Sequence, residues 1–167
     1  MKIEGSAVLL PDNINTDFII SGRYKFAISD MKELSKHIME DIDPDFPKKL
    51  KAGESIIVAG ENFGMGSSRE QAPLVIKAAG IACVVAKSFA RIFYRNGFNI
   101  GLPLITADTS GIKENDKLLI DVEESCIMDS TQNLKIKIEP LSNIMRVLLS
   151  DGGIVNHIKK HNGKIEL

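Results

Sequence analysis

The amino-acid sequence predicts an α/β protein with a mixed sheet, and three features support this class. Short, β-branched apolar runs such as residues 55–59 are typical of buried strands. In the first part of the chain these runs alternate with segments whose apolar residues recur at helical spacing. Paired strand patterns come later in the chain. Alternating strands and helices followed by paired strands indicate a mixed sheet in one domain spanning residues 1–167.

The expected strands follow from apolar runs and from alternation. Four strands are expected at residues 2–9, 55–59, 82–86 and 104–105. A hairpin is expected from residues 117–123 and 134–139, and the second of these segments alternates apolar and charged residues. Such alternation predicts that one face of the hairpin meets solvent.

Helix boundaries are expected where capping residues precede apolar periodicity. Asp30 and Glu33 fit a capping box that begins a helix over residues 31–39. The segment before it, about residues 12–30, is expected to be a functional loop. A final helix is expected over about residues 151–161.

A further helix is expected to begin at a Ser88 cap. Phe89, Ile92 and Phe93 then recur at helical spacing, which predicts that all three belong to the core.

The stretch at residues 64–70 has the composition of an anion site at a strand end. Gly64 and Gly66 permit positive φ angles and close approach of the backbone to a ligand. A helix starting at Ser67 would offer free N–H groups and a positive dipole end to a carboxylate or phosphate. Arg69 adds a guanidinium fork that suits a planar carboxylate.

Two interpretations of Ser67 are open from the residues alone. With Glu70 it fits a capping box, and Gly80 would stop the helix. Its hydroxyl could equally act as a proton-abstracting base or a nucleophile, because the same amides would stabilise its alkoxide.

Composition indicates a soluble protein of the cytoplasm and argues against two classes of partner. The chain has 167 residues and a formal net charge of −1 without a basic block, so neither nucleic acid nor an anionic membrane is expected as a partner. No leader sequence and no apolar span of membrane length are evident. Cys83 and Cys126 are too few for a four-thiolate cluster and match no metal or redox spacing.

No metal site is expected from the histidines. His37 reads as a surface or helix-end residue. His157 and His161 have a spacing that can bind metal, but they lie among lysines with no carboxylate close by in the sequence.

Several motifs in fixed order resemble the aconitase swivel-domain family. These are residues 12–24 (Asp-x-Ile-x-Thr-Asp-x-Ile-Ile-x-Gly-Arg-Tyr), 60–70 (Gly-x-Asn-Phe-Gly-x-Gly-Ser-Ser-Arg-Glu), 86–93 (Ala-Lys-Ser-Phe-Ala-Arg-Ile-Phe) and 96–104. With the chain length, they most resemble the stand-alone small subunits of 3-isopropylmalate dehydratases, in the short form also used by homoaconitases. The resemblance is strong over about residues 1–105 and weaker beyond.

This resemblance implies a three-layer β/β/α swivel fold and an enzyme divided between two chains. A separate large subunit would carry a [4Fe-4S] cluster, in a heterodimer or heterotetramer, and this chain would bind no cofactor itself. Self-association of the chain alone is left open. The roles implied are Ser67 as the base, Ser68, Arg69 and Arg23 as substrate-binding residues, and Thr16 and Asp17 as residues that position the substrate loop.

The resemblance also places substrate choice in the loop after Arg23. Tyr24 and Phe26 would meet the variable arm of the substrate, and Phe26 favours an alkyl arm where homoaconitase-like chains have arginine. Lys25 departs from the usual apolar residue and is either solvated or able to meet a second carboxylate.

The expected reaction is therefore the conversion of 2-isopropylmalate into 3-isopropylmalate by dehydration and rehydration, a step of leucine synthesis. Related enzymes of 2,3-dimethylmalate, citrate or homocitrate remain open, as does a carboxylate-binding module without catalysis. A serine hydrolase would require a histidine close to Ser67.

Overall fold

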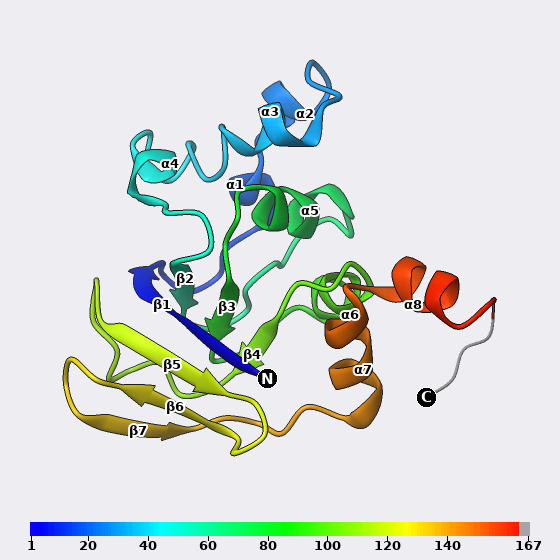
Figure 1. Ribbon diagram of the computed structural model, residues 1–167. Coiled ribbons are helices and arrows are strands. Elements are labelled where there is room, and N and C mark those ends of the chain that lie inside the picture. Colours follow the sequence, from blue (N-terminus) through cyan, green and yellow to red (C-terminus); the bar gives the residue numbers. More distant parts are fainter. Residues whose placement is uncertain (164–167) are drawn as a thin grey trace.

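Seven strands form one mixed sheet in the order β4-β3-β2-β1-β5-β6-β7 (Figure 1). The structure is a computed structural model that describes residues 1–163, apart from the side chain of Lys25. The strands are β1 (Lys2–Leu9), β2 (Ser55–Ala59), β3 (Cys83–Ala86), β4 (Leu104–Thr106), β5 (Lys117–Asp121), β6 (Cys126–Asp129) and β7 (Leu134–Lys137). The predicted α/β class with a mixed sheet is confirmed.

The first four strands are parallel neighbours and lie where the sequence predicts them. Ile57 of β2 pairs with Val8 of β1 on one side and with Val84 of β3 on the other. All residues of β2 and β3 are buried, as the uninterrupted apolar runs indicated. The carboxyl ends of β1, β2 and β3 consequently open onto the same edge of the sheet.

The last three strands are antiparallel, and the predicted hairpin is wrong in its pairing. β5 pairs with β6, and β6 pairs with β7, so β6 separates the two segments that were expected to pair. β6 has only four residues and ends at Asp129, whose buried carboxylate accepts hydrogen bonds from the amides of Thr131 and Gln132. So short a strand lacks the alternation that sequence inspection relies on. In Figure 1, β5–β7 are turned relative to β2–β4, so the single sheet curls.

Eight helices occur within residues 1–163. They are α1 (Thr16–Ile19), α2 (Gly22–Lys25), α3 (Met31–Ser35), α4 (Phe46–Lys49), α5 (Gln71–Ala78), α6 (Arg91–Asn99), α7 (Asn143–Asp151) and α8 (Ile154–Lys160). The expected loop before residue 30 thus contains two short helices. α5 packs against α1, α3 and α6, and α6 packs against β4 (Figure 1).

Two predicted helix ends differ from the structure. Asp30 caps α3 by accepting a hydrogen bond from the Glu33 amide, but the helix ends at Ser35 rather than at Met39. Met39 has a φ of 57°, and its amide bonds to the carbonyl of Ile19. Tertiary pairing with the α1 segment therefore replaces the helical bond.

The final helical region consists of two helices rather than one. α7 was not predicted. Its N-cap is Ser142, and it ends at Asp151, followed by the C-cap Gly152 in the left-handed conformation with φ 76°. The expected helix start at Asp151 is therefore the end of α7, and α8 begins at Ile154.

Candidate functional site

Three loops meet at the carboxyl ends of β1, β2 and β3. The Gly64 amide donates to the carbonyl of Ile14, and the Thr16 amide donates to the carbonyl of Met65, each at 2.8 Å. On the other side, the Phe63 amide donates to the carbonyl of Ser88 at 3.0 Å. The parallel strand order thus brings together motifs that lie about 50 and about 25 residues apart in the sequence.

Gly64 and Gly66 allow these loops to approach closely. Gly64 has a φ of 80°, and a Cβ built there would lie 2.2 Å from the ring of Phe93. Gly66 has a φ of 96°, and a Cβ there would lie 2.4 Å from the side-chain oxygen of Asn15. Both predictions of positive φ are confirmed, and both positions are closed to a side chain by packing as well.

Gly64→Ala is expected to destabilise the protein by about 2–5 kcal/mol, because positive φ and overpacking both oppose a methyl group there. Chemical denaturation would measure the change in the free energy of unfolding. Gly22→Ala is the matched control, since a Cβ at Gly22 meets nothing within 4 Å. Equal stability of the two variants would contradict this account of the loop.

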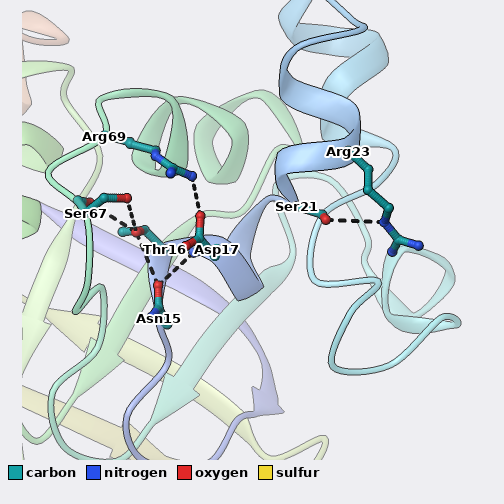
Figure 2. Close-up of polar contacts among 7 residues, drawn as sticks. All are labelled: Asn15, Thr16, Asp17, Ser21, Arg23, Ser67 and Arg69. Atoms are coloured by element: carbon teal, nitrogen blue, oxygen red, sulfur yellow. Dashed lines mark hydrogen bonds and ion pairs between the residues drawn. The ribbon is translucent and has the colours of Figure 1, made fainter.

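Ser67 and Thr16 form the centre of the site (Figure 2). The Ser67 Oγ lies 3.2 Å from Thr16 Oγ1, which also lies 3.1 Å from the carbonyl oxygen of Ser67 and 3.4 Å from Asn15 Oδ1. Thr16 is buried, with 2% of its surface exposed, whereas Ser67 is half-buried and lines a cavity. The buried hydroxyl therefore holds a partly accessible one in place.

The capping interpretation of Ser67 is wrong. α5 begins at Gln71, four residues beyond Ser67, and its N-cap is Glu70 without a side-chain hydrogen bond. α6 likewise begins at Arg91 instead of after a Ser88 cap, and the Ser88 hydroxyl accepts the Asn62 amide at 2.9 Å. Each serine hydroxyl instead forms a hydrogen bond to a neighbouring loop, because the loops meet at the strand ends. The Ser67 hydroxyl is thus not consumed by a helix cap.

Arg69 and Asp17 form an ion pair beside Ser67 (Figure 2). The side chain of Arg69 is 31% exposed, and one terminal nitrogen engages Asp17, so other guanidinium N–H groups remain to meet a carboxylate. Ser68 is exposed and lines the same cavity. This arrangement can hold an anion next to the Ser67 hydroxyl.

A cavity of about 590 Å³ joins this loop to the start of α6. Its wall includes Arg91, Ile92 and Arg95, which sequence inspection did not assign to the site. Ile92 was expected in the core with Phe89 and Phe93, but it is 45% exposed. Phe93 is buried against Gly64, as expected. The spacing of Arg91 and Arg95, four residues apart on a helix, was the available signal for a shared face.

The structure does not bring the Arg23 segment into this cavity. Arg23 forms an ion pair with Asp41, and its Nε lies 3.3 Å from Ser21 Oγ. In Figure 2 the Arg23 side chain points away from the Ser67 cluster. Its substrate-binding role stays a prediction.

Tyr24 and Phe26 also lie outside the residues that line the cavity. Tyr24 stacks on His37 with ring centroids 3.9 Å apart, and a hydrogen bond to Glu40 raises its pKa. Phe26 is 86% exposed. The side chain of Lys25 lies outside the described part of the chain. The substrate contacts predicted for Tyr24 and Phe26 remain predictions.

The C-terminal histidines do have a carboxylate partner, contrary to expectation. Asp151, at the end of α7, accepts a hydrogen bond from His157 Nδ1 at 2.7 Å and pairs with Lys160. His161 Nε2 lies 3.4 Å from the same carboxylate. These three His and Asp side chains lie close enough to share a metal ion, but Lys160 already neutralises Asp151. The expected absence of a metal stays a prediction.

Both cysteines are unpaired and buried. Cys83 is fully buried in β3, and burial raises the pKa of its thiol well above the usual range. Cys126 is 5% exposed. Neither thiol lines the cavity beside Ser67.

Comparison with known protein families identifies the family of this chain. The family model described as the aconitase C-terminal domain matches residues 18–109, which include Ser67, Arg69 and the whole of α6. The chain belongs to this family. The resemblance inferred from the motifs is confirmed.

Relatives of similar length carry one name. A protein of Archaeoglobus fulgidus named 3-isopropylmalate dehydratase small subunit 2 is 50% identical over 161 residues, which cover 96% of this chain and 97% of that protein. A 3-isopropylmalate dehydratase small subunit of Aliarcobacter butzleri is 53% identical over 148 residues, or 88% of each chain.

Comparison with solved structures finds the same enzyme name as the sequence relatives carry. A crystal structure of 3-isopropylmalate dehydratase from Methanocaldococcus jannaschii matches with a TM-score of 0.92 and 49% identity, covering 97% of this chain and 96% of that one. The relatives' name, small subunit, implies a large-subunit partner. Within residues 1–163, no helix is long and apolar enough to span a bilayer.

Proposed function

We propose that this chain is the small subunit of a two-chain hydro-lyase that interconverts 2-isopropylmalate and 3-isopropylmalate through isopropylmaleate, a reaction of leucine biosynthesis. The observation that carries the proposal is the half-buried Ser67 hydroxyl, which caps no helix and lines a cavity together with Arg69. The names of full-length relatives at about 50% identity supply the substrate.

In this proposal Ser67 removes the proton from carbon. A serine alkoxide needs donors that stabilise its charge, and the Thr16 hydroxyl at 3.2 Å can donate to it. Arg69 and Ser68 hold a substrate carboxylate next to the reacting carbon. The neighbouring carbon loses hydroxide at the same time, which gives the alkene. In the rehydration step hydroxide adds to the carbon that lost the proton, and the proton returns to the carbon that lost hydroxide, so the hydroxyl has moved by one carbon.

We propose that the large subunit supplies the [4Fe-4S] cluster, which acts as a Lewis acid on the substrate hydroxyl. The two buried cysteines of this chain fit that division, since a four-thiolate cluster requires more ligands than they provide. Unpaired cysteines also suit the reducing cytoplasm, where we place the enzyme.

The proposal is tested by mixing the purified chain with its large subunit after anaerobic cluster reconstitution. Alkene formation would be followed with 3-isopropylmalate, 2,3-dimethylmalate, citrate and homocitrate, with each subunit alone as a control. Turnover of isopropylmalate only in the mixture is expected. Turnover confined to another substrate would assign a related dehydratase, and an assembled, cluster-loaded complex without turnover would leave a carboxylate-binding role.

Thr16→Val is expected to lower kcat about 10- to 100-fold, because a hydrogen bond to a charged group is lost. Thr16 acts here as a positioning residue, so the pH profile of kcat should also shift toward higher pH as the Ser67 alkoxide loses its donor. Thr16→Ser keeps the hydroxyl and is the matched control. An unchanged pH profile in the valine variant would limit Thr16 to a structural role.

A further inference from the structure

Two of the five arginines of the chain have no partner among the described residues. Arg23 pairs with Asp41, Arg69 pairs with Asp17, and Arg146 donates to the carbonyl of Leu141 at 3.1 Å. Arg91 and Arg95 make no such hydrogen bond or ion pair within residues 1–163, and both are exposed. Both unpaired arginines line the cavity that contains Ser67.

Arg91 and Arg95 lie four residues apart on α6, so their side chains share one face of the helix. Ile92, next to Arg91, lines the same cavity and is 45% exposed. Arginine is enriched at protein interfaces relative to the rest of the protein surface. We call Arg91, Ile92 and Arg95 the α6 face.

The charge of the cavity wall also bears on its occupant. The cavity has a volume of about 590 Å³, and its three arginines outnumber the two carboxylates of a small di-acid. Arg69 already offers a carboxylate site beside Ser67, whereas the α6 face adds two more cations and an apolar side chain. A polypeptide with acidic side chains matches that combination better than one substrate does.

The chemistry of the proposed reaction indicates which polypeptide would occupy the cavity wall. The proposed reaction uses an iron–sulfur cluster, and the two cysteines of this chain are buried away from Ser67, so another chain would bring the cluster to Ser67. That chain has to cover the wall of the cavity in order to close the site. We infer that the α6 face is a docking surface for an acidic patch of the large subunit. This inference rests on the proposed function.

The test measures binding rather than turnover. The large subunit would be immobilised, and the association rate and Kd of this chain would be measured at low and high salt for Arg91→Glu, Arg95→Glu and the double variant. Lys135→Glu is the matched control, because it makes the same charge change on exposed β7, at the edge of the sheet opposite to β4 and α6. Thermal unfolding would verify that each variant is folded.

Each single reversal is expected to weaken binding about 10-fold and the double variant about 100-fold, mainly through slower association, while Lys135→Glu binds normally. High salt should reduce the difference between the unaltered chain and the double variant. At a saturating concentration of the large subunit, kcat of the double variant should return close to normal.

Normal Kd values with a raised substrate KM would overturn the inference, since the arginines would then bind substrate. Failure of the unaltered chain to bind the large subunit would overturn it as well. A complex that forms, weakens on charge reversal and shows no turnover would instead support the docking surface and refute the proposed function.

Discussion

Ser67→Ala is expected to abolish measurable turnover by the assembled enzyme while the fold and subunit binding persist. Loss of a general base costs about 10²- to 10⁴-fold in rate, and the described lining of the cavity contains no histidine, lysine or carboxylate that could replace it. Thr16 retains its 3.1 Å contact with the Ser67 carbonyl in this variant, so the loop should keep its conformation. Steady-state kinetics with saturating large subunit measures kcat.

Ser68→Ala provides the matched control for this prediction. It removes the same hydroxyl from the neighbouring, exposed position, where no hydrogen bond within the described chain depends on it. We expect a raised KM with substantial kcat, because Ser68 is assigned to substrate binding. A Ser67→Ala enzyme as active as Ser68→Ala would remove Ser67 from the role of base.

Asp151→Ala is expected to lower the thermal unfolding midpoint on the order of 10 °C. The Asp151 carboxylate is 4% exposed and accepts from His157 Nδ1 at 2.7 Å, while it also neutralises Lys160. His157 is fully buried, and its Nε2 has no partner among the described residues, so the mutation would leave the whole imidazole without a hydrogen bond. Breaking a buried pair by removing one partner is more costly than losing a surface ion pair.

Asp45→Asn is the control for the Asp151 prediction. Asp45 pairs with Lys48 on the surface, where both side chains are more than half exposed, and its loss should change the midpoint little. A comparable midpoint for the Asp151 and Asp45 variants would show that the C-terminal network does not stabilise the fold.

The same network predicts a pH dependence of stability. Lys160 and then His157 hold the pKa of Asp151 at about 2, below its ordinary value of 3.8. Because the folded-state pKa is the lower one, the contribution of Asp151 is fully present above about pH 4 and is lost as the pH falls toward 2. Denaturant midpoints at several pH values should therefore converge for the unaltered chain and Asp151→Asn at low pH.

The strands of the parallel half and the glycine conformations of the site could be predicted from local sequence. Residues 56–59 and 83–86 are apolar at every position, and burial on both faces of a parallel sheet imposes that pattern. Gly64 and Gly66 signalled positive φ because only glycine adopts it without strain. Ser67 and Arg69 signalled an anion site through their functional groups alone.

Other features could not be read because they depend on residues distant in the chain. β6 becomes a strand by pairing with its neighbours β5 and β7, since its four residues carry no periodic pattern of their own. Ser67 and Ser88 fit helix caps locally, yet interloop partners engage them. A side chain forms hydrogen bonds with the partners that the packed structure places near it, so tertiary contacts can override local capping preferences.

By itself, the sequence determined the α/β class, the positions of the first four strands and the residues proposed to form the site, because these depend on side-chain type and short-range spacing. Only the tertiary structure decided that the Thr16 hydroxyl meets Ser67, that Asp17 holds Arg69, and that Arg91 and Arg95 join the same cavity. The physical reason is the parallel order of β1, β2 and β3, which brings distant loops to one edge of the sheet.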